Sequence, residues 1–455
     1  MYDWKYLCYT KHYQEKERGN KMKKKIIVAI LTAAMIITTL AACKKADPPV
    51  AAPTTAARSG EAELPAEAAL QGDIVFATMS TGALGDIQAE MIADFMKENP
   101  GVKVEIQVNT TDYESLMKAK MAANDMPDVF MTHGWSLIRY SEYLLPLTGE
   151  PWAETMADTL KASMCDEDGN FYALSTTVDL TGVLVQMDIL KELGMEMPVT
   201  VDNFLECCEA AKNAGYDAVF MAGKDTRSPA YVLDLMAPSF LLNNDDGTNA
   251  SALADGSFDW DLWIPVVDFL QTLKDNGYMN IDCATADTIF QAEKLVNKEA
   301  LFIFQRNSVL SQCWEISPEA NVGFIPFPVQ SAEDSPYLAG GEGVAFGIWK
   351  DGKHLDIARA LLEFLARPEN VEKMCYAEGA PSGQKNVEVS LGKIDPWVEQ
   401  WSDVKALPWF DRVYLPSGMW AILRDTGSAI IAGEATPEEA TAIMKENYLK
   451  LFSQQ

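Results

Sequence analysis

The residue types that commonly perform catalysis are present, but they lack the spacing that catalysis requires. None of the three histidines, His12, His133 and His354, has a partner at metal-ligand spacing. Gly82-Ala-Leu-Gly85 lacks the Lys-Ser/Thr of a phosphate-binding loop, and no nucleophile elbow occurs. Carboxylates are numerous enough that the acid/base pair of a glycosidase remains an alternative, although the sequence does not indicate which two residues would form it. The sequence favours a protein that is not an enzyme and uses no metal or cofactor.

One tryptophan lies where a ligand-binding loop is expected. Trp135 ends Thr132-His-Gly-Trp135, directly after the apolar run 128–131. Ligands of open α/β sheets bind beyond the carboxyl ends of the strands. We therefore interpret Trp135 as a ligand-contacting residue, and packing beneath the helix that follows is the alternative.

The N-terminal region carries export signals. Three lysines at 23–25 precede an apolar run at 26–40, and Leu40-Ala-Ala-Cys43 follows. This order is that of a secretory signal, and the run is short for a membrane-spanning helix. Leu-Ala-Ala-Cys resembles the bacterial lipobox, which implies cleavage before Cys43 and acylation of its thiol. The start codon can be that of Met1 or that of Met22, because a chain that begins at Met22 has a signal peptide of ordinary length.

Composition divides the chain and limits its partners. Residues 1–42 are interpreted as leader and signal peptide, and residues 43–71, rich in Ala, Pro, Thr and Glu, as a flexible tether. The remaining 72–455 are long enough for two domains. The formal net charge of −29 repels phosphate backbones, so nucleic acid is not expected as a partner. The six cysteines after Cys43 are expected to be mostly buried free thiols, and one disulfide of unreadable pairing stays open.

Strand-like and helix-like segments alternate along the folded part, which indicates an α/β fold with largely parallel sheets. Apolar or alternating strand patterns occur at 73–77, 102–108, 128–131, 182–186, 218–222, 300–305, 322–327 and 343–348. Helical patterns occur at 87–96, 112–123, 188–193, 201–214, 263–273 and 355–366, and the chain is mostly helical from 416 to 451.

A series of motifs along residues 72–455 carries a family resemblance. Its blocks are Phe95-Met-Lys-Glu-Asn-Pro-Gly-Val, Met126-Pro-Asp-Val-Phe, Asp188-Ile-Leu-Lys-Glu-Leu-Gly, Phe324-Ile-Pro-Phe-Pro and Gly340-Gly-Glu-Gly. In this order and spacing they resemble the family 1 extracellular solute-binding proteins, the carbohydrate receptors of ABC importers. The resemblance implies a two-lobed, periplasmic-binding-protein-like fold of type II, in which each lobe is a mostly parallel sheet flanked by helices and the ligand cleft lies between the lobes.

The same resemblance implies the lobe boundaries and the role of the protein. Residues 72–178 are expected in lobe 1, 179–325 in lobe 2, 326–395 in a return to lobe 1, and 396–455 in the C-terminal helices of lobe 2. The expected function is that of a monomeric, lipid-anchored receptor outside the cell membrane, which delivers a sugar or oligosaccharide to the permease subunits of an ABC transporter. A receptor of the same fold for a polyamine, glycerophosphodiester or peptide, and a surface glycosidase, remain the alternatives.

The resemblance also marks cleft residues, because sugars require aromatic platforms and planar hydrogen-bonding side chains. Trp420 opens a helix at the position of a sugar-stacking tryptophan in maltose-type members. Arg306 and Asn307 follow the strand pattern at 300–305, where the family often has Gly-x-Trp and this chain does not. Three further residues near the first loop and the two crossovers between lobes complete the expected ligand-binding set: Ser80, Asp179 and Glu342.

Overall fold

The computed structural model describes residues 69–109, 113–132, 140–166, 168–243 and 247–453. The signal segment, Cys43, the tether and Trp135 lie outside these residues, so their predicted roles stay predictions. The chain divides into residues 1–67 and a second unit of residues 68–455, which contains all the described elements. Within the described part, none of the helices combines the length and the apolar character needed to span a membrane.

The first lobe is built on a five-stranded sheet of order β2-β1-β3-β10-β4. Its strands are β1 (Gly72–Thr78), β2 (Val102–Val108), β3 (Val129–Met131), β4 (Ala173–Ser175) and β10 (Ala345–Ile348). Strand β10 pairs antiparallel with both β3 and β4, whereas β1 pairs parallel with β2 and β3. Four of the described strands therefore run in one direction and β10 in the other. The helices of this lobe are α2 (Gly82–Glu98), α3 (Tyr113–Ala123), α5 (Asp158–Met164), α13 (Leu355–Leu365) and α14 (Pro368–Glu378).

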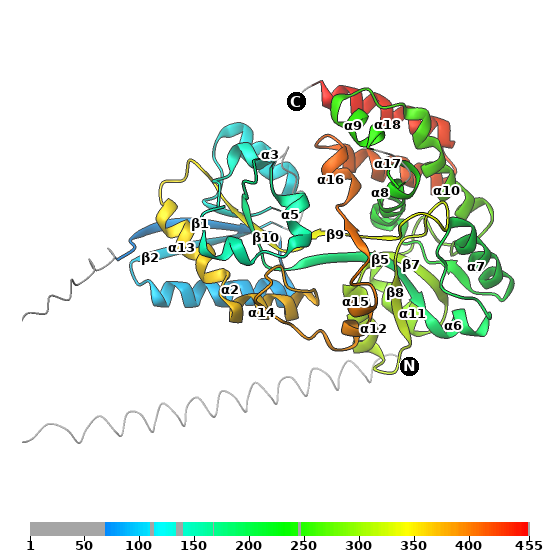
Figure 1. The fold of residues 1–455 in the computed structure, drawn as a ribbon, viewed down its shortest axis with the longest axis horizontal. Coiled ribbons are helices and arrows are strands. Elements are labelled where there is room, and N and C mark those ends of the chain that lie inside the picture. The colour runs from blue at the N-terminus through cyan, green and yellow to red at the C-terminus, as the bar shows by residue number, and fades with distance from the viewer. Residues whose placement is uncertain (1–68, 110–112, 133–139, 167, 244–246, 454–455) are drawn as a thin grey trace, which may run out of the picture. The chain divides into compact units, whose positions relative to one another are not determined.

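The second lobe repeats this plan with a six-stranded sheet (Figure 1). Strand β5 (Val178–Gln186) pairs antiparallel with β7 (Ala300–Arg306), β8 (Val322–Ile325) and β9 (Tyr337–Glu342). Strand β6 (Asp217–Val219) runs parallel to β7, and β11 (Lys405–Leu407) runs parallel to β9. Each sheet thus has one reversed strand among the described ones, and the prediction of two lobes with mostly parallel sheets is confirmed.

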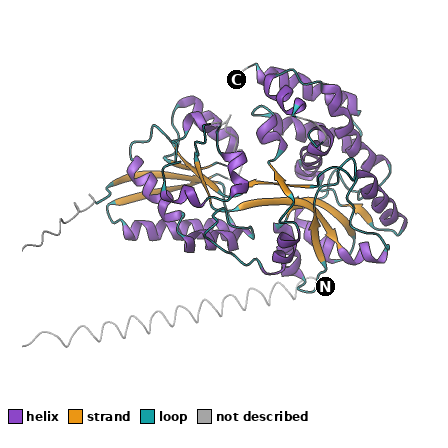
Figure 2. Cartoon of the chain, viewed as in Figure 1, coloured by secondary structure: helices purple, strands orange, loops and turns teal. Residues whose placement is uncertain are grey.

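Helices surround the second sheet, and helices form most of the chain that follows its last strand, β11 (Figure 2). They are α6 (Met187–Glu192), α7 (Val201–Asn213), α8 (Arg227–Leu241), α9 (Thr248–Asp255), α10 (Ile264–Asp275), α11 (Gln291–Val296), α12 (Ser308–Ile316), α15 (Asp395–Gln400), α16 (Phe410–Tyr414), α17 (Met419–Ala432) and α18 (Pro437–Phe452). Helix α18 begins at a capping box in which Thr436 and Glu439 satisfy each other's backbone N–H groups. Helix α17 ends at Gly433, whose φ of 74° suits a residue without a Cβ.

Each lobe has its own hydrophobic core. Phe76 and Phe346, 5.2 Å apart between ring centroids, lie in the core of the first lobe. Phe204 and Phe302, 4.7 Å apart, lie in the core of the second. The cysteines of the described chain are all free thiols, and four of the six are buried: Cys207, Cys208, Cys313 and Cys375. Burial raises the pKa of Cys313 and of Cys375 to about 12, so these thiols are protonated structural side chains.

Three chain segments cross between the lobes. They lead from β4 to β5, from β9 to β10, and from α14 to β11. The Gly343 N–H donates to the Thr177 carbonyl (2.9 Å), and the Gly383 N–H donates to the Thr176 carbonyl (3.0 Å). The Thr177 hydroxyl in turn accepts the Val344 N–H at 2.8 Å. Backbone hydrogen bonds therefore fasten the three crossing segments to one another.

One boundary prediction is wrong. Residues 326–395 were expected to return to the first lobe as one piece, but β9 pairs with β5 from Thr181↔Ala339 to Val178↔Glu342 and so belongs to the second sheet. The chain returns only at β10. Two adjacent glycines, at 340 and 341, are typical of a loop, but in the structure both lie in β9. A Cβ on Gly340 would lie 2.9 Å from the Asp179 carbonyl oxygen. Close strand packing explains that glycine. The other predicted boundaries stay predictions.

Candidate functional site

A cavity of about 480 Å³ lies beside the second sheet, and Met79 of the first lobe borders it. Its volume is in the range of small-molecule binding sites. Its other walls come from the end of β7, from α8, α12 and α17, and from the segment 409–412 that begins α16. Elements far apart in the sequence therefore converge on one space.

Trp409 is one of three described aromatic residues that line this cavity. It precedes α16 and is 3% exposed, and its indole Nε1 donates to Asp179 Oδ2 at 3.2 Å. The Cζ atoms of Arg306 and Arg412 lie 5.6 Å and 5.3 Å from its ring centroid, within range of cation–π attraction. Tyr231 of α8 lies 5.2 Å from Trp409 and 5.7 Å from Trp420 of α17 between ring centroids. These contacts fix the orientation of the indole.

Asp179 joins the tryptophan to an arginine. Its carboxylate Oδ2 lies 3.3 Å from Arg306 Nε, an ion pair without hydrogen-bond alignment. Asp179 is 6% exposed, and its charge is the main reason why the pKa of Arg306 is raised above its ordinary value. Because Asp179 is the second residue of β5 and Arg306 is the last residue of β7, the antiparallel pairing of these strands brings the two charges together.

A second buried ion pair lies at the crossing from β9 to β10. Arg412 Nη1 donates to Glu342 Oε1 at 2.9 Å, and the two side chains are 10% and 4% exposed. Glu342 ends β9 just before the chain returns to the first lobe. The pair therefore connects the crossing segment with Arg412, which also lines the cavity.

A buried carboxylate supports the segment that carries Trp409 and Arg412. Asp234 of α8 is fully buried, and its Oδ1 accepts the Asp411 N–H at 2.7 Å. Burial, followed by the neighbouring Asp411 charge, raises the pKa of Asp234 well above its ordinary value. Asp234 thus holds the first turn of α16, and with it the arrangement of the aromatic and cationic groups.

The structure brings together four of the predicted ligand-binding residues. Arg306 and Trp420 line the cavity, while Asp179 and Glu342 hold its arginines. Asn307, the residue after Arg306, is 2% exposed, and its backbone N–H donates to the Leu180 carbonyl. It is not among the described residues that line the cavity. Ser80 lies inside the first lobe, where its hydroxyl accepts from Gln88 Nε2 at 3.0 Å, and it does not line the cavity either. The ligand role of all these residues stays a prediction.

Sequence reasoning missed Trp409, Tyr231 and Arg412. Trp409 is the second residue after β11, with Pro408 between them. The rule that ligands bind beyond the carboxyl ends of strands, which singled out Trp135, therefore applies to Trp409 as well. The strand itself is only Lys-Ala-Leu and shows no alternation to reveal it. Tyr231 lies on a helix that is buried along most of its length, where its spacing indicates only core packing.

The groups around the cavity are of the kinds that hold a ligand. Two indoles, guanidinium groups, amides and hydroxyls line the cavity, and the carboxylates of Asp179 and Glu342 hold two of its arginines. Within the described ranges, His, Cys, Asp and Glu side chains form no group of three or more that could hold a metal ion. Two α/β lobes, one reversed strand in each sheet, and a cavity bounded by both lobes define the class of two-lobed solute-binding proteins.

The chain belongs to the bacterial extracellular solute-binding protein family, whose sequence model matches residues 90–406. It is 30% identical over 383 residues to the melibiose/raffinose/stachyose-binding protein MelE of Bacillus subtilis, a match that covers 84% of this chain and 90% of that protein. The family prediction is therefore confirmed, and membership implies an extracellular or periplasmic location.

Two solved structures agree with this assignment. A binding protein from Bacillus subtilis in an open conformation has a TM-score of 0.80 at 30% identity and covers 84% of this chain and 98% of its own. A sugar transporter protein from Bacillus licheniformis, solved in complex with stachyose, has a TM-score of 0.76 at 31% identity, covering 84% of this chain and 100% of its own.

Proposed function

We propose that this protein is the lipid-anchored receptor of an ABC importer, which captures a sugar or oligosaccharide and delivers it to the permease. The observation that carries the proposal is Trp409, an indole held in place by Asp179, Tyr231 and two arginines at a cavity of the second lobe that Met79 of the first lobe borders. An aromatic ring of this kind packs against the C–H face of a sugar ring. The guanidinium groups beside it donate to hydroxyl oxygens.

The relatives narrow the class of sugar. MelE is named for melibiose, raffinose and stachyose, and the Bacillus licheniformis protein was solved with stachyose. These three sugars share a galactose unit linked to glucose and differ in length. Oligosaccharides that contain this unit are therefore the proposed ligands of this chain.

Capture requires the lobes to move about their connections. The three crossing segments are fastened to one another by backbone hydrogen bonds, so they form one connecting unit about which the lobes close. Met79 of the first lobe already borders the cavity of the second, and closure would bring more of the first lobe against the ligand. The closed form would be the form that the permease recognises.

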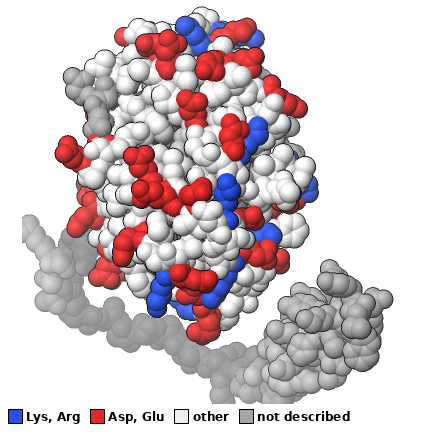
Figure 3. Space-filling view, turned by 90° about the vertical axis from the view of Figure 1, so that its right-hand side faces the viewer, with Lys and Arg blue, Asp and Glu red and all other residues white. Residues whose placement is uncertain are grey.

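Anchoring rests on the sequence Leu40-Ala-Ala-Cys43, and two acyl chains would hold the protein stably at a membrane. Figure 3 shows acidic side chains spread over the visible face of the molecule, with basic ones among them. With a formal net charge of −29, the protein would favour basic permease loops as docking partners.

The test is a thermal-shift and calorimetric titration of the purified protein with melibiose, raffinose, stachyose, spermidine and glycerophosphocholine. A sugar present at 100 times its Kd should stabilise the folded state by about 2.7 kcal/mol. Trp409→Ala should abolish this shift, whereas Trp397→Ala, which removes a tryptophan of the same lobe outside the cavity lining, should keep it. A shift with spermidine or glycerophosphocholine alone would reject the carbohydrate proposal, and release of monosaccharides would favour a glycosidase.

A further inference from the structure

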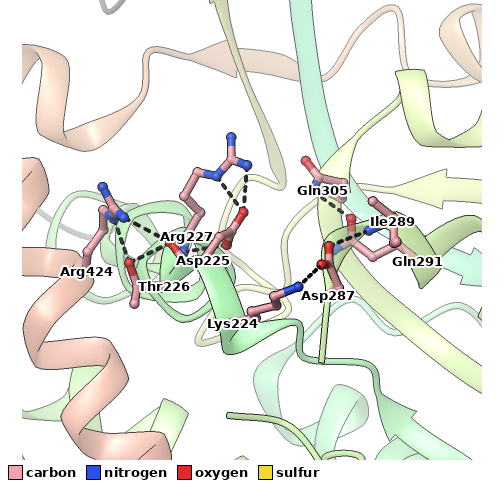
Figure 4. A network of polar contacts seen from close by, with 9 residues as sticks. All are labelled: Lys224, Asp225, Thr226, Arg227, Asp287, Ile289, Gln291, Gln305 and Arg424. Atoms are coloured by element: carbon pink, nitrogen blue, oxygen red, sulfur yellow. Dashed lines mark hydrogen bonds and ion pairs between the residues drawn. The ribbon is translucent and has the colours of Figure 1, made fainter. Parts of the chain in front are cut away.

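A backbone turn with a conformation that a side-chain-bearing residue rarely adopts leads directly into Arg227, which lines the cavity. Thr226, between the 3₁₀ turn η3 (Gly223–Asp225) and α8, has a φ of 63°. Such conformations persist only where the surroundings impose them, and they gather at functional sites. Arg424 of α17 imposes this one, because its Nε donates to the Thr226 hydroxyl at 2.7 Å and its Nη2 donates to the Asp225 carbonyl at 3.0 Å (Figure 4).

The turn fixes an arginine at the cavity. Asp225 Oδ1 accepts the Arg227 N–H at 3.0 Å, and Oδ2 accepts Arg227 Nε at 2.8 Å. The Arg227 side chain is nevertheless 53% exposed and lines the cavity. A guanidinium has five N–H groups, more than one carboxylate takes up, so Arg227 keeps donors for a ligand. Its orientation is set before any ligand arrives, which lowers the entropic cost of binding.

A second turn lies beside the first, and its residues Thr288 and Ile289 line the cavity. Lys224 Nζ donates to Asp287 Oδ2 at 2.5 Å, and Asp287 Oδ1 accepts the Ile289 N–H in the 3₁₀ turn η5 (Thr288–Phe290). The ion pair thus links the two turns (Figure 4). Ile289 is 72% exposed, an unusual state for a large apolar side chain beside a cavity.

Gln291, directly after this turn, has an unmet hydrogen-bonding group. It is 3% exposed and lines the cavity, and its Oε1 accepts Gln305 Nε2 at 3.1 Å. Its own Nε2 is buried and has no partner among the described residues. Buried donors without a partner are rare in folded proteins, and a bound molecule is one way to satisfy them.

We propose that Arg227, Ile289 and Gln291 form a second sugar subsite, which takes the unit beyond the one that packs on Trp409. This inference rests on the proposed function. The subsite offers an apolar side chain for a C–H face and a guanidinium and an amide for hydroxyls, the groups that a sugar unit requires. Because both subsites line one cavity, a longer oligosaccharide reaches both, whereas a disaccharide fills only the first. The second subsite therefore selects for length.

The test compares ligands that share the melibiose unit and differ in length. Dissociation constants of the full chain for melibiose, raffinose and stachyose are measured by calorimetry for wild type, Arg227→Ala and Lys450→Ala. Lys450→Ala removes the same charge from an exposed position on α18. Arg227→Ala should weaken stachyose binding about tenfold and melibiose binding less than about twofold, and Lys450→Ala should leave all three constants unchanged.

A positioning variant separates the subsite from a general loss of folding. Arg424→Ala leaves Arg227 in place but removes the support of the turn, so the ratio of the melibiose to the stachyose constant should fall toward that of Arg227→Ala. This ratio is measured on one protein preparation, so partial unfolding cancels. Equal weakening for all three sugars, or no weakening with Arg227→Ala, would overturn the second subsite. If wild type binds none of the sugars, the proposed function itself fails.

Discussion

The ion pair between Glu342 and Arg412 gives a stability prediction with a definite size. Arg412→Met keeps much of the side-chain length but removes the guanidinium from a carboxylate that is 4% exposed. Removing one partner of a buried pair costs about 3–5 kcal/mol. We expect the lower end, about 3 kcal/mol, because Arg412 keeps 10% exposure and water can approach the site from the cavity. For a folded unit of residues 68–455, this loss should lower the melting temperature by about 4 °C.

A double-mutant cycle shows whether the pair causes this loss. Glu342→Gln together with Arg412→Met removes both charges while it keeps the approximate shape, so the double variant should recover most of the stability lost in Arg412→Met. Free energies of unfolding are measured in urea by tryptophan fluorescence and by circular dichroism, whose agreement checks two-state behaviour.

The control is an ion pair on the surface. Lys97→Met breaks the pair between Lys97 and Asp94, whose side chains are 76% and 41% exposed, and should leave the urea midpoint unchanged. The reasoning is refuted if Arg412→Met costs less than about 1 kcal/mol, or if the double variant is as unstable as the sum of the two single variants.

Two further predictions concern a glycine of a connecting segment and a buried glutamate at the end of α14. Gly343→Ala should lower the melting temperature, because its Cβ would lie 2.4 Å from Thr177 Oγ1. Gly149→Ala, where the Cβ meets open space, should leave the melting temperature unchanged. Equal melting temperatures for the two variants would contradict the prediction, since they would show that the crossing segment accommodates the Cβ without loss of stability. Burial raises the pKa of Glu378, which ends α14, although Arg306 opposes the shift. The folded state therefore binds this proton more tightly than the unfolded state, and stability should fall as pH rises from the ordinary glutamate pKa through the raised value. The melting temperature of Glu378→Gln relative to wild type should accordingly rise between about pH 4 and pH 8, and a constant difference would contradict this.

The fold was predictable where burial imposes a pattern on the sequence. The alternation at 102–108 corresponds to β2, and the continuous apolar run at 300–305 corresponds to β7, which is buried along nearly its whole length. Strand β9 was missed, because its buried sequence contains two adjacent glycines, which are typical of a loop, and one of them, Gly340, packs closely on β5. Short strands at the edge of a sheet, such as β11, have too few residues for any period to appear.

The site was predictable only in part, for a different reason. Arg306 could be placed because it follows an obvious strand, but Trp409 and Asp179 meet across 230 residues of chain. Such a contact depends on which strands pair, and periodicity within one segment carries no information about pairing. The second turn at the cavity was missed in the same way, since the ion pair between Lys224 and Asp287 also joins segments that are distant in sequence.

The position of β10 in the first sheet has a consequence for the synthesis and export of the chain. Phe346 of β10 pairs with Met131 and with Leu174, so an inner strand of the first lobe belongs to a part of the chain that follows most of the second lobe. A chain that leaves the ribosome or crosses a membrane from its N-terminus exposes the edges of β3 and β4 until β10 has emerged. Contacts between such distant segments slow folding. The sheet of the first lobe therefore cannot be completed until residues 345–348 have emerged, after most of the chain of the second lobe.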